Sequence, residues 1–333
     1  VRVIRRALDA RKKQDMHFLL NVVATLEDAA AKHLLSRSEA NVEPYVETKT
    51  EPLQPGTETP RGRIIVAGLG PAGLFAAYQL AAAGYAPLVL ERGDAVEQRA
   101  ERVAHYWATG ELDESSNVMF GEGGAGTFSD GKLTSRSKDA RGEGVLHTLV
   151  RFGAPQEIAI DAKPHIGTDK LRSTVSAMRK EIERLGGEVR FRATLTGMEH
   201  RDGSISRIRV SSPAGIETID CAALVLAIGQ GARDTYQMLY DAGIAMAPKA
   251  FAVGVRVEHP QNMIDQTQYG PLAGHPRLGA AEYRLTAQSG ERGVYTFCMC
   301  PGGRVIASAS KADEIVVNGM SNYARSAENA NAA

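Results

Sequence analysis

The alternation of apolar and polar positions predicts strands and helices in turn through the middle of the chain. An apolar run at 63–67 precedes a glycine-rich turn, an amphipathic helix follows over 74–81, and a second apolar run covers 86–90. Strand, helix and strand in this order are typical of a parallel βαβ unit. We therefore expect an α/β fold with a parallel sheet.

The pattern after this unit predicts a longer helix and a group of short strands. Apolar positions recur with a helical period over 169–185, and Gly186-Gly187 ends that helix. The short strands in the middle of the group predict an antiparallel β-meander, after which an apolar run returns the chain to the sheet. The predicted strands lie at 188–191, 195–198, 204–210, 217–220 and 223–229.

Residues 1–40 predict a small α+β unit of their own. The stretches 1–8 and 16–26 flank a polar turn as in a β-hairpin, and a helix is expected over 27–35. Four prolines between 41 and 61 indicate an extended linker. The chain starts without a methionine and trails away in small residues, so we expect a fragment that is cut at both ends.

The turn that follows the first apolar strand is a candidate dinucleotide site. It reads Gly-Leu-Gly-Pro-Ala-Gly over 68–73 and lies between a strand and a helix, which is the context of the dinucleotide fingerprint. Its glycines let the backbone approach a pyrophosphate, which meets free N–H groups at the helix N-terminus. A carboxylate after the second strand is expected to bind ribose hydroxyls and favours FAD or NAD over NADP. The predicted contacts are Gly68, Gly70, Pro71, Ala72, Gly73, Glu91 and Arg92.

Composition narrows the class of protein. The 333 residues are 43% hydrophobic and 23% charged, with 39 basic and 39 acidic side chains, so no global field recruits nucleic acid or an anionic membrane. Three cysteines do not make a disulfide framework. We find no membrane-length apolar run and no signal peptide, and we expect a cytoplasmic protein.

A second glycine-rich segment covers residues 114–133. Five glycines alternate there with Thr, Ser and Asp. Such a segment can pass close to a planar ligand and present backbone N–H groups to it.

Four stretches together resemble a bacterial family of FAD-dependent dehydrogenases, within the wider glutathione-reductase-like group of flavoproteins. They lie at 116–133, 162–172, 254–260 and 297–303, and read SNVMFGEGGAGTFSDGKL, AKPHIGTDKLR, GVRVEHP and FCMCPGG. The resemblance implies a Rossmann-like FAD-binding domain over 62–245, with a parallel sheet and a β-meander. It also implies an inserted substrate domain over 246–333.

The same resemblance implies where FAD lies. The cofactor is expected to extend from the first glycine turn to the segment 123–132, and the small residues around 227–229 resemble an Ala-Thr-Gly element with Ile228 in place of Thr. The implied contacts are Gly123, Gly124, Ala125, Thr127, Ser129, Asp130, Gly131, Lys132, Leu195, Ala227 and Gly229. A late Gly-Asp element of related flavoproteins has no counterpart here apart from Gly93-Asp94.

Catalytic residues are harder to identify, because flavin itself performs the electron transfer. The candidates are Cys298, Cys300, Lys132 and Arg256, with His259 and Arg325 as further groups for an anionic substrate or the flavin ring. A strand over 294–300 would place both thiols on one face, roughly 7 Å apart, which favours small pocket-lining residues over a dithiol relay. We expect no metal site.

The chain is therefore interpreted as an FAD-dependent oxidoreductase that acts on a small molecule, with NAD(P)H as a possible donor. One alternative is a simple NAD-dependent dehydrogenase that uses the same turn. Another is a non-redox protein in which bound nucleotide stabilises an RNA- or protein-binding platform, and salt-dependent RNA binding would favour it. Its contact surface would be the basic hairpin residues Arg5, Arg6, Arg11, Lys12 and Lys13.

Overall fold

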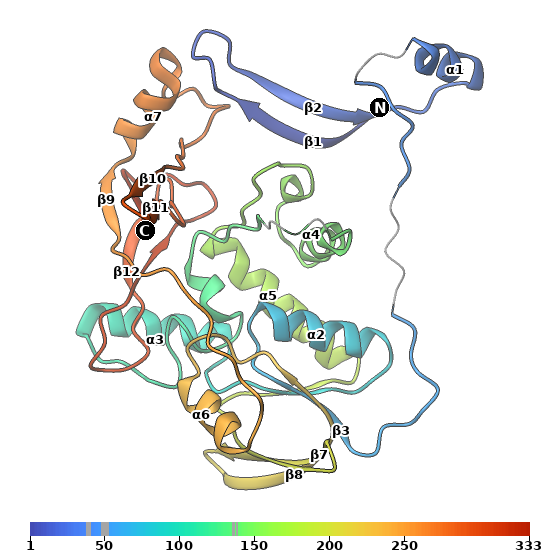
Figure 1. Ribbon diagram of the computed structural model, residues 1–333, viewed down its shortest axis with the longest axis vertical. Coiled ribbons are helices and arrows are strands. Elements are labelled where there is room, and N and C mark those ends of the chain that lie inside the picture. Colours follow the sequence, from blue (N-terminus) through green and yellow to red (C-terminus); the bar gives the residue numbers. More distant parts are fainter. Residues whose placement is uncertain (38–40, 48–52, 135–136, 138) are drawn as a thin grey trace.

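A six-stranded mixed sheet lies at the lower end of the computed structural model as Figure 1 shows it. The structure describes residues 1–37, 41–47, 53–134, 137 and 139–333. The strand order is β5-β4-β3-β8-β7-β6. The first four strands are parallel, and the last three form an antiparallel meander. The strands are β3 (Arg63–Ala67), β4 (Leu88–Leu90), β5 (Glu188–Arg190), β6 (Thr194–Arg201), β7 (Ser204–Ser212) and β8 (Gly215–Leu226). The expected mixed α/β fold is confirmed.

Strand β8 joins the two halves of the sheet. Its first half pairs with β7 as far as Asp220, and from Cys221 onward it pairs with β3. The prediction of two separate strands over 217–220 and 223–229 is therefore wrong. The side chains of β8 change from polar to apolar near Asp220, where its pairing partner changes from β7 to β3. The strand itself continues unbroken to Leu226.

Helices cover one face of the parallel strands and the meander covers the other, so these strands are buried on both sides. Val66 and Val89 belong to a core cluster with α2 and α5, whereas Ile65 and Leu88 face a second cluster that includes the meander. This burial accounts for the continuous apolar runs that predicted the strands. The helices of this part are α2 (Pro71–Ala82), α3 (Val96–Thr109), α4 (Arg141–Arg151), α5 (Thr168–Arg184) and α6 (Arg233–Asp241), with the 3₁₀ turns η1 (Gly124–Phe128) and η2 (Gln156–Ala159).

The N-terminal residues form the predicted hairpin and helix, namely β1 (Arg2–Asp9), β2 (His17–Val23) and α1 (Asp28–Ser36). Every described position of β2 except Val23 is exposed. The tip of the hairpin packs through Leu8, Ala10 and Met16 on the C-terminal part of the chain. Residues 38–40 and 48–52, which fall within the predicted unit and linker, lie outside the described residues.

Two of the five basic hairpin residues are paired with carboxylates. Arg6 donates to Asp161 at 2.8 Å, and Arg11 forms an ion pair with Asp9. Arg11 also lowers the pKa of Asp9 to about 2 through these hydrogen bonds. The positive charge available to a nucleic acid on the hairpin is smaller than its sequence suggests.

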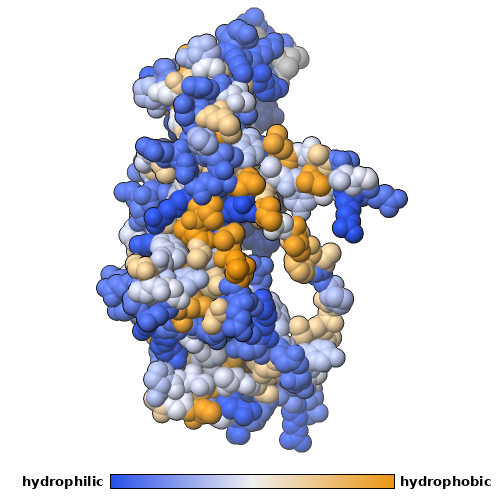
Figure 2. Space-filling view, turned by 90° about the vertical axis from the view of Figure 1, so that its left-hand side faces the viewer, coloured by the Kyte–Doolittle hydropathy of each residue, from blue (hydrophilic) through white to orange (hydrophobic). Residues whose placement is uncertain are grey.

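The C-terminal part is built from short strand pairs. β9 pairs with β14, β10 with β11, and β12 with β13. Figure 2 shows apolar side chains gathered on the face of the molecule that it presents. The exposed large apolar residues of the C-terminal part include Phe251, Val253, Val255 and Phe297. The elements are β9 (Val257–Pro260), α7 (Gln261–Tyr269), η3 (Gly270–Leu272), β10 (Thr286–Ser289), β11 (Arg292–Tyr295), β12 (Arg304–Ala307), β13 (Val317–Met320) and β14 (Asn329–Ala332). The domain boundary at residue 246 stays a prediction.

Among the described residues, no helix combines the length and the apolar character that a membrane span requires. The same residues hold no group of three or more His, Cys, Asp or Glu side chains that could bind a metal ion.

Candidate functional site

The turn between β3 and α2 is closed by contacts that only glycine allows. Gly68 has φ +99°, and a Cβ there would lie 2.4 Å from the carbonyl oxygen of Ala227. A Cβ on Gly73 would lie 1.8 Å from the carbonyl oxygen of Gly68. Gly70 differs, because its Cβ would meet only the Cα of Gly124 at an ordinary 3.8 Å. Gly68 and Gly73 are therefore required by packing, and Gly70 leaves space beside the backbone.

A cavity of about 480 Å³ opens over this turn. Its size and its mixture of backbone and apolar walls are typical of a small-molecule site. Its walls come from the carboxyl ends of β3, β4 and β8, from the second glycine segment, and from α6. Eleven of the predicted cofactor contacts line it, namely Gly68, Gly70, Pro71, Ala72, Glu91, Arg92, Gly124, Ala125, Leu195, Ala227 and Gly229.

Helix α2 points its N-terminus at this cavity. Its first internal hydrogen bond runs from the N–H of Leu74 to the carbonyl of Gly70 (2.9 Å), and no side chain caps it. The N–H groups of Ala72 and Gly73 precede that bond, so they have no partner within the helix. Pro71 occupies the first turn, where its missing donor costs nothing. A negatively charged group is stabilised at such a helix end.

Glu91 holds the loops around the cavity. Its buried carboxylate accepts the N–H of Leu69 (2.8 Å), of Gly93 (2.9 Å) and of Gly121 (3.0 Å). A carboxylate offers about four acceptor positions, so one remains for a ligand. From the sequence, Glu91 is expected only to bind ribose hydroxyls. The structure shows that it also joins three loops through hydrogen bonds.

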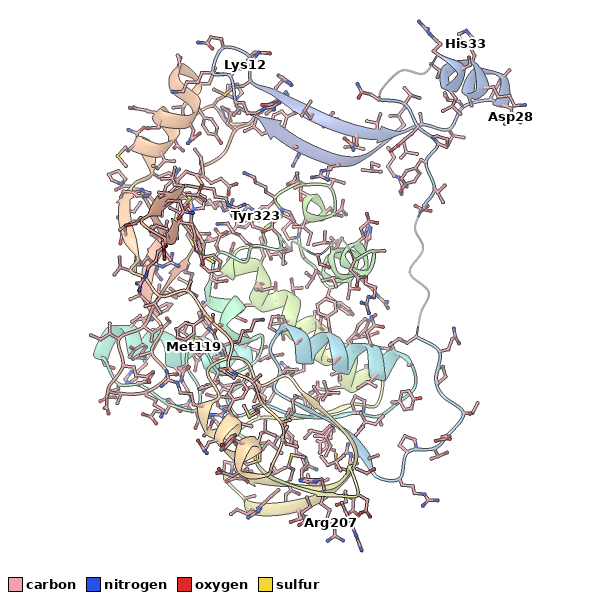
Figure 3. The ribbon with its side chains drawn as sticks, viewed as in Figure 1. Lys12, Asp28, His33, Met119, Arg207 and Tyr323 are labelled. Carbon is pink, nitrogen blue, oxygen red and sulfur yellow. The ribbon has the colours of Figure 1, made fainter. Side chains whose placement is uncertain are left out.

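The far end of the cavity contains residues that sequence reasoning missed. The Arg92 guanidinium lies 4.5 Å from the centre of the Phe120 ring and donates to Asp234 (2.9 Å) and Thr235 (3.0 Å). Aromatic and apolar side chains from α6 and the second glycine segment complete this wall. The missed lining residues include Met119, Phe120, Gln230, Thr235, Tyr236 and Leu239, and Figure 3 labels Met119 near α3.

A buried arginine folds the second glycine segment. Arg99 is 0% exposed. It donates to the carbonyls of Asn117 (2.9 Å), Val118 (3.0 Å), Gly121 (3.3 Å) and Glu122 (2.6 Å). Burial lowers the pKa of Arg99 to about 10, which keeps the guanidinium charged near neutral pH. In the sequence, Arg99 is one arginine within an amphipathic helix, and nothing there predicts that it binds these carbonyls.

The two glycine-rich segments touch directly. Gly123 donates its N–H to the carbonyl of Leu69 (2.8 Å), and a Cβ on Gly124 would lie 3.0 Å from the Cα of Gly70. The glycines of both segments predicted that backbone would come close to a ligand. In the structure, part of this close approach is between the two segments themselves. Seven predicted contacts do not line the cavity and lie at or beyond this junction, namely Gly73, Gly123, Thr127, Ser129, Asp130, Gly131 and Lys132.

Asp130 forms the centre of a charged cluster beyond the cavity. Its carboxylate pairs with Arg325 (2.5 and 3.0 Å), accepts the hydroxyl of Ser321 (2.5 Å) and lies 3.7 Å from Lys132 Nζ. Burial opposes ionisation of Asp130, but Arg325, Lys132 and Ser321 outweigh it and lower the pKa of the carboxyl. Lys132 also donates to the carbonyl of Met299.

The remaining catalytic candidates lie in the same cluster. Arg256 donates through Nη1 to the carbonyl of Cys298 (3.2 Å) and to Asn331 Oδ1 (2.5 Å). Asn331 and Cys300 exchange backbone hydrogen bonds at 2.7 and 3.2 Å. The structure therefore brings Lys132, Arg256 and both cysteines together, although they are distant in sequence.

The predicted strand over 294–300 is wrong. β11 ends at Tyr295, and Cys298 has φ +44°, which breaks the extended backbone. Cys298 is exposed, Cys300 is buried, and both are free thiols. Burial raises the pKa of the Cys300 thiol to about 11. Gly302 packs against the backbone of Arg325, so the turn after the cysteines contacts protein.

His259 and His165 serve packing contacts in this region. His259 on β9 hydrogen-bonds the Tyr283 hydroxyl at 2.8 Å. His165 stacks on Tyr323, which Figure 3 labels near the centre of the molecule, with ring centres 5.5 Å apart.

A known protein-family model matches the C-terminal part of the chain. Residues 250–333 match the family model described as "FAD-dependent protein, C-terminal domain-like". An uncharacterized protein of Clostridium beijerinckii is 50% identical over 336 residues, an alignment that covers 99% of this chain and 62% of that protein. This chain thus spans less than two thirds of the relative's length.

Solved structures with a local resemblance include THI4 of Thermovibrio ammonificans, with 16% identity, 55% of this chain and 64% of that chain covered, and a TM-score of 0.37. L-proline dehydrogenase from P. horikoshii shows 15% identity, 56% and 57% coverage, and a TM-score of 0.31. The match of residues 250–333 agrees with the FAD-dependent part of the resemblance seen in the sequence. The dehydrogenase activity and the glutathione-reductase-like group stay predictions.

Proposed function

We propose that this chain is the FAD-binding part of an oxidoreductase that transfers a hydride by way of flavin. The observation that carries the proposal is the glycine-walled cavity at the N-terminus of α2. The C-terminal match to an FAD-dependent family model supports it. The Rossmann-like nature of residues 62–245, NAD(P)H as donor, a small-molecule substrate and a cytoplasmic location are further expectations of the proposal.

The residues present fit an ADP moiety. The free N–H of Ala72 at the N-terminus of α2 would hold the pyrophosphate, and the remaining acceptor position of Glu91 would take a ribose hydroxyl. Arg92, Phe120 and Tyr236 would enclose the adenine at the far end of the cavity. FAD would supply the reversible uptake of two electrons.

The second glycine segment gives the direction of the flavin end. Gly124 and Ala125 line the cavity, and the segment continues through Ser129 to Asp130 and Lys132. The protein's part of the chemistry is then to orient a ring along this segment and to place charge near it.

Reconstitution with FAD tests the proposal. We expect the purified chain to take up FAD and become yellow, and the flavin absorbance to bleach when NADH or NADPH is added without oxygen. A chain that stays colourless with excess FAD would contradict the proposal. Binding of NAD without FAD would favour the simple dehydrogenase.

Gly70→Val tests the same proposal by filling the cavity without disturbing the fold. The backbone of Gly70 has φ −70°, and its Cβ would make only ordinary contact, so the fold is expected to tolerate a side chain that enters the cavity. We expect FAD affinity to fall by at least about tenfold, roughly 1.4 kcal/mol, with little change in the urea midpoint. Gly142→Ala, in α4 with no heavy atom near its added Cβ, should leave FAD binding unchanged.

A further inference from the structure

The charged cluster beyond the cavity has more positive than negative charge. Lys132, Arg256 and Arg325 each contribute one positive charge, and Asp130 is the only carboxylate that pairs with any of them among the described residues. Arg256 has no ion-pair partner in that part of the chain. The excess lies in a partly buried region, because the side chains of Arg325 and Asp130 are 12% and 4% exposed. Uncompensated charge of this kind is costly unless a ligand neutralises it.

Two buried donors in the cluster have no acceptor in the described structure. They are Arg256 Nε and Asn331 Nδ2. Asn331 is 0% exposed, and its other amide atom, Oδ1, already accepts from Arg256 Nη1. Buried N–H groups are nearly always paired in native proteins, so these two donors point to an acceptor that is not part of the described chain.

Gly319 packs against Arg256, Asn331 and Cys300, so these three side chains lie close together. A Cβ on this residue would lie 2.3 Å from Asn331 Oδ1, 2.5 Å from Arg256 Nη1 and 2.6 Å from Cys300 Sγ. Lys132 and Arg256 also act on the exposed Cys298: burial raises the pKa of its thiol, and the two cations oppose that shift. The pKa of the Cys298 thiol stays raised overall, and an anion held by Arg256 and Lys132 would lie near this thiol.

We propose that Arg256, Asn331 and Lys132 form a binding site for the carboxylate group of a small organic acid. A carboxylate supplies one negative charge and several acceptor positions, which matches both the charge excess and the orphan donors. The identification of this acid as the substrate rests on the proposed flavin function. The anion site itself does not depend on it.

Alkylation of Cys298 tests the site without an assay of turnover. Iodoacetate and iodoacetamide react with a thiolate in the same way: sulfur attacks the methylene carbon, an S–C bond forms, and iodide leaves. They differ in that only iodoacetate carries a carboxylate. The ratio of the two rates cancels the thiolate fraction, and Cys221 and Cys300 are buried, so the reaction reports on Cys298.

At Cys298, identified by mass spectrometry of its peptide, the folded chain is expected to show an iodoacetate-to-iodoacetamide rate ratio about tenfold higher than the urea-unfolded chain. Acetate should suppress this preference, and acetamide should not. Arg256→Met should abolish the preference and Arg256→Lys should retain part of it. Arg284→Met, at an exposed arginine outside the cluster, should leave it unchanged. Equal ratios in the folded and unfolded chain would overturn the proposal, and the acetate competition decides the matter even if a variant fails to fold.

The same rates measured with saturating FAD separate a substrate site from a flavin contact. Persistence of the preference with FAD bound supports a carboxylate substrate. Its loss would assign the donors to the flavin ring and overturn the proposal. If the chain binds no FAD, the proposed function fails, and the FAD-free measurements still decide whether the anion site exists.

Discussion

The cavity over α2 and the charged cluster around Asp130 are built in opposite ways. The cavity owes its shape to backbone: glycines at 68, 73 and 124 make the close contacts, and Glu91 ties three loop N–H groups together. The cluster owes its properties to side chains from four separate stretches of the chain. Backbone sites are specified by short motifs, whereas side-chain sites depend on tertiary folding. The two regions should therefore respond differently to substitution.

The largest effect is expected at Arg99, beneath the cavity. Arg99→Met removes a donor from four carbonyls. Those of Gly121 and Glu122 keep a second donor, in the N–H of Gly124 and the hydroxyl of Thr127, and we expect the free energy of unfolding to fall by about 4 kcal/mol. Urea unfolding measures it. Arg102→Met, on the same helix with a side chain 47% exposed, should cost less than about 1 kcal/mol. Equal losses in the two variants would mean that Arg99 does not organise the segment.

A somewhat smaller effect is expected at the turn itself. Gly73→Ala places a Cβ 1.8 Å from the carbonyl oxygen of Gly68, so α2 must shift, at a cost of about 3 kcal/mol. FAD binding should weaken together with stability, in contrast to Gly70→Val. For comparison, Gly142→Ala should stabilise by up to about 1 kcal/mol. Wild-type stability in Gly73→Ala would rule out the tight packing described here.

The smallest effect concerns the cluster and appears only at alkaline pH. The Cys300 thiol has a folded-state pKa of about 11, raised by burial from an ordinary 9.0. The raised pKa of this thiol stabilises the folded chain in full below pH 9. The stabilisation is lost as pH rises toward 11, because the unfolded chain releases the thiol proton at a lower pH than the folded chain does.

Over that interval the wild type should lose about 2 kcal/mol more than Cys300→Ala, as urea unfolding at a series of pH values would measure. A parallel decline of the two proteins would show that the thiol ionises as freely in the folded state as in the unfolded one. The cluster would then be more open to water than the structure indicates.

Sequence reasoning succeeded where a local pattern carries the information. It predicted the strand before Gly68, the helix over 74–81 that the structure extends to Pro71–Ala82, the helix of α5 and the placement of Glu91 at a strand end. It failed where identity depends on a distant partner. Three features follow from tertiary packing, which the spacing of residues in the sequence does not predict. They are the hydrogen bonds of Arg99, the cavity wall formed by Phe120 and Tyr236, and the contact between Arg256 and Asn331.

Strand β8 also has a consequence for the order of folding. The floor of the cavity lies between Gly68 and Ala227, and it forms only when β3 pairs with β8 along Ala67 and Leu226. That pairing closes a loop of nearly half the chain, so its entropic cost is paid late, after the intervening helices and hairpins have formed. A nucleotide that binds at this floor would recognise the finished fold and would be a selective stabiliser of correctly folded molecules over partly folded ones.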